Sequence, residues 1–95
     1  MLNCEWDETK NIANQQKHKI SFETAQYVFL DPAARHSPDR VVDGEERRHV
    51  IGKILNIVVV LVVYTERNGN MRIISARPAS RKERILYHGK KKKNA

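Results

Sequence analysis

The sequence predicts a single α+β domain, and three observations lead to that prediction. Two polar segments with helical periodicity come first, three β-rich segments follow, and a charged helical segment comes last. A chain of 95 residues has room for one compact domain with one core. Helices separated along the chain from an antiparallel sheet are typical of an α+β fold with the helices laid on one sheet face. We expect the domain to span residues 1–89 and a basic tail to follow at 90–95.

Two helices are predicted at the start of the chain. Asp7 is a good N-cap, and the helix after it, at residues 8–18, has evenly spaced polar side chains that either face solvent or contact RNA: Lys10, Asn14 and Lys17. Ser21 is a second N-cap, and apolar residues recur after it at the spacing of a helix that packs on the core: Phe22, Ala25 and Phe29. Asp31 and Pro32 end this second helix.

Strands are predicted in the middle of the chain. They lie at residues 47–54, 56–65 and 71–77, and a short edge strand is expected at 33–36 before a polar loop at 37–40. The antiparallel sheet therefore has three to four strands. The middle strand is apolar at consecutive positions, so both of its faces should be covered. Its apolar run is far shorter than the ~20 residues of a membrane-spanning helix.

Turn and cap signals complete the predicted fold. The Asn68-Gly69-Asn70 segment suits a hairpin between the last two strands. Ser80 and Glu83 form a capping-box pattern, which begins a final helix that runs through about His88. Gly89 is the expected stop of this helix.

Charge is unevenly distributed along the chain. Residues 1–34 carry three lysines against five acids, a net charge of −2, whereas residues 35–95 carry fifteen lysines and arginines against six acids, a net charge of +9. A positive field of this size favours a polyanion through direct attraction and through release of the counterions condensed on it. Nucleic acid is therefore the expected partner, and simple solubility is the other explanation of the charge.

Cysteine content and the start of the chain indicate a cytoplasmic protein. Cys4 is the only cysteine, which excludes a disulfide framework and a cysteine-rich zinc site. Residues 1–7 lack the basic start, apolar core and cleavage site of a signal peptide. We therefore expect neither secretion nor a membrane partner.

Motifs for several kinds of chemistry are missing. The four histidines show no HxxxH or HxH spacing, the four glycines are isolated, and no serine or cysteine lies in a nucleophile-elbow motif. We therefore expect no metal and no cofactor. The remaining chemical feature is a series of cations on the predicted sheet and last helix: Arg47, Arg48, Lys53, Arg67, Arg72, Arg77, Arg81, Lys82 and Arg84.

Such a series of cations suits RNA cleavage without a metal. In that reaction the ribose 2′-OH attacks the adjacent phosphorus, so the enzyme must position the phosphate and stabilise extra negative charge. Arginine donates two parallel hydrogen bonds to phosphate and keeps its proton at working pH. The candidates for proton transfer are Glu46, His49, Glu83 and Tyr87.

Several of these residues also have a purely structural interpretation. Glu83 is explained as a helix cap, His49 as a surface residue of a strand, and Tyr87 as a residue that packs on the sheet. Arg72 and Arg77 differ by an odd number of positions, so in a straight strand they point to opposite faces. A bulge, or a site at the end of the strand, is needed to bring both into one site.

Segments along nearly the whole chain resemble the BrnT family. They are Glu5-Trp6-Asp7, Phe29-Leu30-Asp31, Glu45-Glu46-Arg47, Val63-Tyr64-Thr65-Glu66-Arg67, and the specific string RIISARPASRKER at residues 72–84 with Tyr87 after it. Lys19 departs from the family pattern, which usually has glycine there. A left-handed turn costs lysine more, so we expect a different shape for the break between the first two helices.

The resemblance implies a RelE-like fold and a metal-independent endoribonuclease activity that blocks translation. It also implies neutralisation by a small DNA-binding antitoxin of the BrnA type, with toxin and antitoxin together repressing their own operon. The chain has no evident DNA-binding motif, so operator DNA would be reached only through the antitoxin. RNA, including mRNA on the ribosome, is the expected substrate.

On these grounds we expect three arginines to hold the scissile phosphate, namely Arg47, Arg72 and Arg77. Proton transfer is assigned to one of three residues: Tyr87, Glu46 or His49. Further cations are expected to bind RNA: Arg48, Lys53, Arg67, Arg81 and Arg84. The competing interpretation is a non-catalytic basic nucleic-acid-binding or co-repressor protein, which has the same charge and needs no acid or base.

Overall fold

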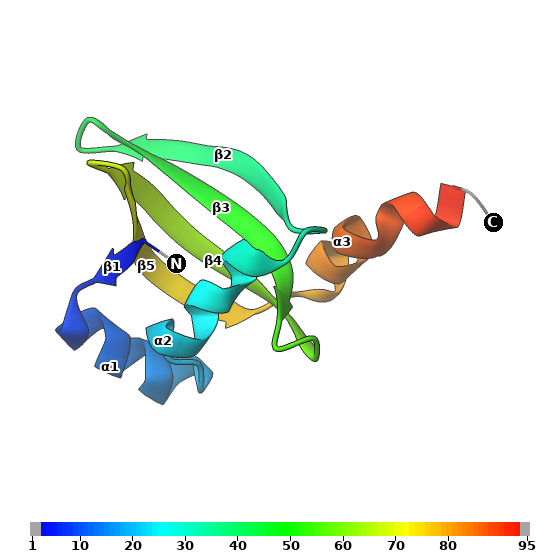
Figure 1. Cartoon of the computed structure of the whole chain (residues 1–95), viewed down its shortest axis with the longest axis horizontal. Coiled ribbons are helices and arrows are strands. Elements are labelled where there is room, and N and C mark those ends of the chain that lie inside the picture. Colours follow the sequence, from blue (N-terminus) through cyan, green and yellow to red (C-terminus); the bar gives the residue numbers. More distant parts are fainter. Residues whose placement is uncertain (1–2, 94–95) are drawn as a thin grey trace.

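The computed structural model describes the backbone of residues 3–93 and the side chains of residues 3–89, and it has the predicted α+β architecture (Figure 1). Its elements in chain order are β1 (Cys4–Trp6), α1 (Glu8–His18), α2 (Phe22–Ala25), the 3-10 helix η1 (Gln26–Leu30), β2 (Arg35–Val42), β3 (Glu45–Ile54), β4 (Val58–Arg67), β5 (Asn70–Pro78) and α3 (Arg81–Lys93). None of these described helices has the length and apolar character that a membrane span requires.

The five strands form one sheet in the order β1-β5-β4-β3-β2. β1 pairs with β5 in parallel, and every other neighbouring pair in the described sheet is antiparallel. The central strand β4 is covered on both faces, as its continuous apolar run predicts, since Val60, Leu61 and Val62 are all buried. Asn68 and Gly69 both adopt the left-handed conformation, which suits the predicted hairpin turn.

The prediction of three to four antiparallel strands was wrong at both edges of the sheet. At one edge Cys4–Trp6 is a fifth strand, which pairs with residues 71–73. At the other edge residues 37–40 are not a loop, because β2 runs through them alongside β3. A bulge at Asp39 follows Pro38, whose missing N–H is tolerated on an edge strand.

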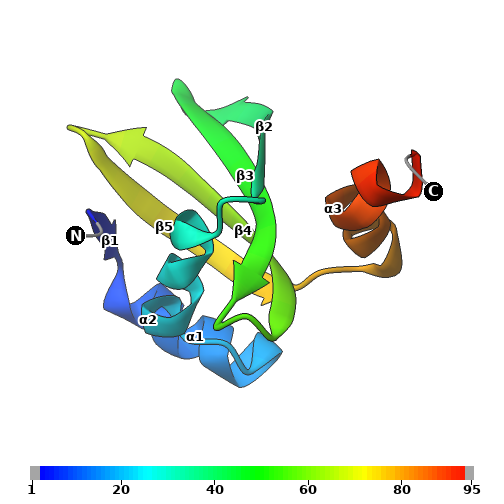
Figure 2. The same ribbon diagram turned by 45° about the vertical axis from the view of Figure 1, so that its right-hand side comes forward.

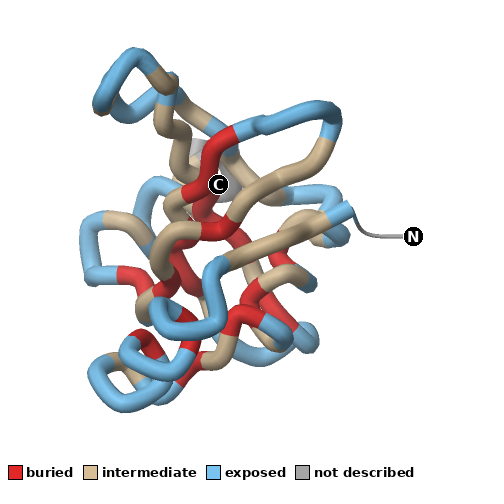
Figure 3. The backbone as a smooth tube through the Cα atoms, turned by 90° about the vertical axis from the view of Figure 1, so that its left-hand side faces the viewer, coloured by how far each residue is buried: buried red, intermediate tan, exposed pale blue. Residues whose placement is uncertain are grey.

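The helices cover the two faces of the sheet very unequally (Figures 1 and 2). α1, α2 and η1 pack on one face, and the core cluster lies beneath them: Ile20, Phe22, Ala25, Val28, Val50, Ile54, Val60, Val62, Tyr64, Ile73 and Ala76. Figure 3 shows these buried segments at the centre of the molecule and the exposed loops around them. α3 lies apart from the other helices and contacts the sheet mainly at β3, so the expectation of all helices on one face was wrong for α3.

Two buried asparagines on α1 join the helices to the sheet. The side-chain amide of Asn14 donates to the carbonyl oxygens of Ile20 at 2.9 Å and Ala76 at 2.8 Å, and its oxygen accepts from the Ala76 N–H at 3.2 Å. The side chain of Asn11 accepts from the Phe22 N–H at 2.8 Å. The expectation that Asn14 faces solvent or RNA was therefore wrong, because its amide satisfies buried backbone groups.

Capping residues close in sequence determine where α1 and α2 begin. The side chains of Asp7 and Ser21 accept hydrogen bonds from N–H groups in the first turns of α1 and α2, as predicted. Lys19 has a φ of 63°, so the break after α1 is left-handed and the expected change of shape does not occur. The backbone of α3 continues through Gly89, so the predicted stop there was wrong. A glycine inside a helix costs only about 1 kcal/mol.

Replacing Asn14 with alanine should destabilise the fold strongly. The change leaves buried backbone groups of Ile20 and Ala76 without partners, which should lower the free energy of unfolding by about 2–4 kcal/mol. Urea denaturation followed by circular dichroism measures this loss. Lys17→Ala, at an exposed position of the same helix, is the control and should change stability by less than about 0.5 kcal/mol. Equal stability of the two variants would contradict the role given to Asn14.

Candidate nucleic-acid interface

A β-bulge at Ile74 decides which side chains of β5 share a face. Val63 on β4 pairs with Ser75, but the next residue, Tyr64, pairs with Ile73, so Ile74 has no partner on β4. One extra residue shifts the alternation of side chains between the two faces of a strand. Residues on either side of the bulge therefore share a face when their numbers differ by an odd count.

The bulge brings Arg72 and Arg77 to the same face. Arg72 pairs with Thr65 and Arg77 pairs with Leu61, and these two β4 residues are four positions apart. The even-numbered residues of β4 belong to the core cluster, so the two arginines lie on the face that α1 and α2 leave uncovered (Figure 2). We call this the open face. The bulge that the odd spacing of Arg72 and Arg77 requires is therefore present in β5.

The open face gathers most of the predicted site residues. Arg47 pairs with Thr65 from the β3 side, and His49 pairs with Val63. Alternation and register place seven cations and His49 on this face: Arg35, Arg40, Arg47, His49, Lys53, Arg67, Arg72 and Arg77. Arg35 and Arg40 were not predicted, because they share a face only through the bulge at Asp39, which has no clear sequence signal.

Glu46 and Arg48 lie on the opposite face of β3, because they alternate with Arg47. Arg48 Nη1 lies 3.9 Å from Glu46 Oε1. A hydrogen bond with the buried Tyr64 is the main reason that the pKa of Arg48 is raised, and the Tyr64 hydroxyl lies 2.8 Å from His36 Nδ1. The structure therefore does not bring Glu46 or Arg48 together with the residues of the open face.

Carboxylates from both ends of the chain hold the two arginines of β5. Glu5 accepts a hydrogen bond from Arg72 Nη1 at 3.0 Å, which is the main cause of a lowered pKa for Glu5. Glu83 on α3 forms a bidentate pair with Arg77, in which both N–O distances are 2.8 Å. Glu83 also accepts from the Ser80 N–H at 2.8 Å, so it is the predicted helix cap. Its carboxylate joins α3 to β5.

Tyr87 joins α3 to the segment after η1. Its hydroxyl donates to Asp31 Oδ2 at 2.6 Å, and the same oxygen accepts from the Lys53 N–H at 2.7 Å. Burial and the contact with Asp31 raise the pKa of Tyr87 to about 12. Burial alone would raise the pKa of Asp31, but hydrogen bonds from Tyr87 and from the backbone of Lys53 and Ala33 lower it overall. The sequence indicated Asp31 only as a helix stop, since 56 residues separate it from Tyr87.

Arg81 and Arg84 lie on α3 rather than on the sheet. Arg84 Nη1 donates to the carbonyl oxygen of Ala79 at 2.9 Å, and both arginines line a cavity of about 260 Å³ together with Ile85 and His88. In the part of the chain that the structure describes, no three His, Cys, Asp or Glu side chains come together where they could hold a metal ion. The open face therefore carries guanidinium, ammonium and imidazole groups, together with carboxylates that pair with its arginines.

The Glu83 pair makes stability depend on pH in acid. Hydrogen bonds from Arg77 are the main cause that lowers the pKa of Glu83 from 4.5 to about 2. A carboxyl whose pKa is lower in the folded state adds stability above its unfolded pKa and loses it as the pH falls. Glu83→Gln should therefore lower the free energy of unfolding by about 1–2 kcal/mol at pH 7, and most of this difference should be lost as the pH falls to about 2. Thermal melts between pH 7 and pH 2 measure the effect, and a difference independent of pH would contradict it.

Known proteins identify the family of this chain. The family model described as the ribonuclease toxin BrnT of type II toxin-antitoxin systems matches residues 6–83. The crystal structure of the Brucella abortus ribonuclease toxin BrnT matches with a TM-score of 0.69 at 23% sequence identity, over 85% of this chain and 100% of that chain, which establishes a common fold. No curated protein matches the chain. Because the family match covers most of its length, the chain belongs to the BrnT family of ribonuclease toxins of type II toxin-antitoxin systems.

Proposed function

We propose that the open face cleaves RNA without a metal ion. The observation that carries the proposal is the arrangement of Arg47, Arg72 and Arg77 with His49 in adjacent rows of the sheet face that lies opposite α1 and α2. The proposed functional unit is one RelE-like domain at residues 1–89, and the tail at 90–95 adds attraction to RNA that does not depend on sequence. Ribonuclease activity is also what the family match supports.

Two arginines of this face are placed to hold one phosphate. Arg47 and Arg72 flank Thr65 in one row across three strands, so their Cα atoms are roughly 10 Å apart. Arginine side chains of that separation can both reach a phosphate above Thr65 and donate paired hydrogen bonds to it. Arg72 binds Glu5 through Nη1, which leaves it other donors. Among the described residues no carboxylate lies within ion-pair distance of Arg47, so its guanidinium is available to phosphate.

His49 is the proposed general base. It accepts the proton of the ribose 2′-OH as the 2′-oxygen bonds to phosphorus, while the arginines stabilise the added negative charge. The bond from phosphorus to the 5′-oxygen breaks, and the 5′-oxygen takes a proton from water, which gives a 2′,3′-cyclic phosphate and a 5′-hydroxyl. Tyr87 is not assigned this role because its hydroxyl keeps its proton and donates it in a hydrogen bond to Asp31. Glu46 is not assigned it because it lies on the other face of β3.

The family match supports a biological setting for this chemistry. We propose as substrate mRNA in the cytoplasm, free or on the ribosome, so that cleavage blocks translation. A BrnA-type antitoxin is the proposed partner that neutralises the chain. In this proposal the antitoxin supplies the contacts to operator DNA, and toxin and antitoxin repress their operon together.

Two neighbouring arginines of β3 offer a matched test. Arg47→Ala should lower the rate of RNA cleavage by about 100-fold, because the transition state loses a charged donor. Arg48→Ala removes the same charge from the opposite face and should leave the rate within about threefold, since only general attraction to RNA changes. The assay incubates purified antitoxin-free protein with a defined RNA in EDTA at low salt and detects ends with 2′,3′-cyclic phosphate. His49→Gln belongs in the same assay and should also lose cleavage.

Each other outcome of this assay has a definite meaning. Equal losses in Arg47→Ala and Arg48→Ala would show that charge alone matters and would remove the open face as the active site. RNA that stays intact in EDTA, both free and on translating ribosomes, would leave the non-catalytic binding role. Salt dependence of RNA binding does not separate the two roles, because both predict it.

Tyr87→Phe separates a structural role of this tyrosine from a catalytic one. Loss of the hydrogen bond to Asp31 should speed amide hydrogen exchange in α3, because the side-chain link between this helix and the segment after η1 is gone. RNA cleavage should stay within about threefold of the parent rate, since another residue is the proposed base. Exchange measured by mass spectrometry beside the EDTA assay checks both. Lost cleavage with unchanged exchange would instead make Tyr87 catalytic.

A further inference from the structure

Five apolar side chains are exposed together at the end of the β3–β4 hairpin and along η1. We call them the tip patch: Tyr27, Leu30, Leu55, Ile57 and Val58. Their exposed fractions run from 42% for Val58 to 77% for Ile57. Single exposed apolar residues are ordinary, but a contiguous group of them marks a surface that another molecule covers.

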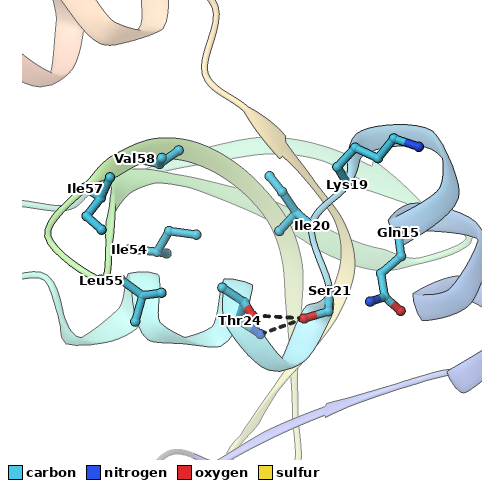
Figure 4. Close-up of a pocket in the computed structure, with 9 residues that line it drawn as sticks. All are labelled: Gln15, Lys19, Ile20, Ser21, Thr24, Ile54, Leu55, Ile57 and Val58. Atoms are coloured by element: carbon cyan, nitrogen blue, oxygen red, sulfur yellow. Dashed lines mark hydrogen bonds between the residues drawn. The ribbon is translucent and has the colours of Figure 1, made fainter.

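Two cavities open on either side of Leu55 and make the tip patch concave. One, of about 390 Å³, has the hairpin end as one wall and the segment between α1 and α2 as the other, including Lys19 and Ile20 (Figure 4). The second, of about 220 Å³, lies between the hairpin and η1 and is lined by Tyr27, Leu30 and Lys53 among others. Both cavities share Leu55, so the patch is continuous through this residue.

Leu55 lies in the turn that joins β3 to β4. Leu55 has a φ of 53° and its neighbour Asn56 a φ of 59°, which is the left-handed region that glycine adopts most easily. Leu55 is nevertheless 62% exposed, so burial within this chain does not offset the strain. The hairpin explains this backbone conformation, since the Ile57 N–H donates to the Ile54 carbonyl oxygen at 3.0 Å across the turn. The exposure of so large an apolar side chain at the turn adds to the evidence that another molecule covers the patch.

The charges around the patch decide between possible occupants. Lys19 lines the larger cavity, where no acidic side chain appears, and Lys53 lines the smaller one. Asp31 in the smaller cavity already accepts hydrogen bonds from Tyr87 and from the backbone. A second copy of this chain, with net charge +7, would bring like charge to a lysine-rimmed surface. The patch is instead complementary to a protein segment that combines apolar anchors with acidic residues.

We propose that the tip patch is the docking surface for an acidic amphipathic segment of the antitoxin. The inference rests on the proposed function in one respect, namely that the partner is the protein antitoxin of this type II system. Arg47 and His49, the proposed active-site residues of β3, lie toward one end of this strand, and Ile54, which lines the larger cavity, ends it, whereas Lys53 belongs to both surfaces. Antitoxin affinity and RNA cleavage are therefore separable by mutation.

The turn itself supplies a matched pair of variants. Leu55→Gly removes the apolar anchor and relieves the left-handed strain, so it should raise or maintain the melting temperature while it weakens antitoxin binding by at least about tenfold. Asn56→Gly relieves the same kind of strain and keeps the tip patch, so its antitoxin affinity should equal that of the parent chain. Ile57→Asn, at the most exposed position of the patch, should also weaken binding by about tenfold without unfolding the domain.

The experiment is isothermal titration calorimetry of each full-length variant with the purified antitoxin encoded in the same operon, with melting curves and the EDTA cleavage assay run in parallel. Reduced affinity in Leu55→Gly and Ile57→Asn, with the affinity of Asn56→Gly and RNA cleavage unchanged, supports the proposal. Unchanged affinity in Leu55→Gly overturns it. A dimer of the chain that Ile57→Asn abolishes, with antitoxin affinity intact, also overturns it and assigns the patch to a second copy. Because calorimetry does not depend on turnover, an inactive parent chain would contradict the proposed function and leave this test standing.

Discussion

The contact between Asn14 and Ala76 supports the geometry on which the other features depend. β1 ends opposite Ile73, so the outer edge of β5 has no strand partner from the bulge at Ile74 onward, while its other edge stays paired with β4. There the amide of Asn14 both donates to and accepts from the backbone of Ala76, as a neighbouring strand would. The bulge in turn places Arg77 on the open face. A buried polar contact under α1 thus supports the arrangement of charges on the opposite side of the sheet.

Acidic residues from the two ends of the chain give the arginines of β5 fixed directions. Glu5 comes from the first strand and Glu83 from the last helix, and they bind Arg72 and Arg77. Pairing of this kind orients a guanidinium before a substrate arrives, which lowers the entropy lost on binding. Arg47 lies on β3, which β4 separates from the strand of Arg72. Among the described residues it has no carboxylate partner. The face therefore combines two oriented cations with one that is available to phosphate.

Charge and apolar character are separated along the sheet. The open face carries guanidinium groups above the central strand, whereas the far end of the β3–β4 hairpin carries exposed Leu55 and Ile57. An RNA backbone is recognised through charge, and a protein segment is recognised through buried apolar anchors. Asp31 contacts two parts of the domain, since it accepts a hydrogen bond from Tyr87 of α3 and also lines a cavity of the tip patch. The Asp31 carboxylate thus holds α3 in place and forms part of the wall of the tip patch.

Local interactions are what the sequence by itself determined. The caps at Asp7, Ser21 and Ser80, the hairpin turn and the buried central strand depend on neighbours a few residues apart, and all were predicted. Tertiary structure alone decided the two bulges, the parallel pairing of β1 and the burial of Asn14, because each depends on pairing between distant segments. The arginines of the candidate site could be named from their chemistry, but which of them share a face could not. Strand register determines which arginines share a face, and the one unpaired residue in β5, Ile74, moves the side chains beyond it to the opposite face.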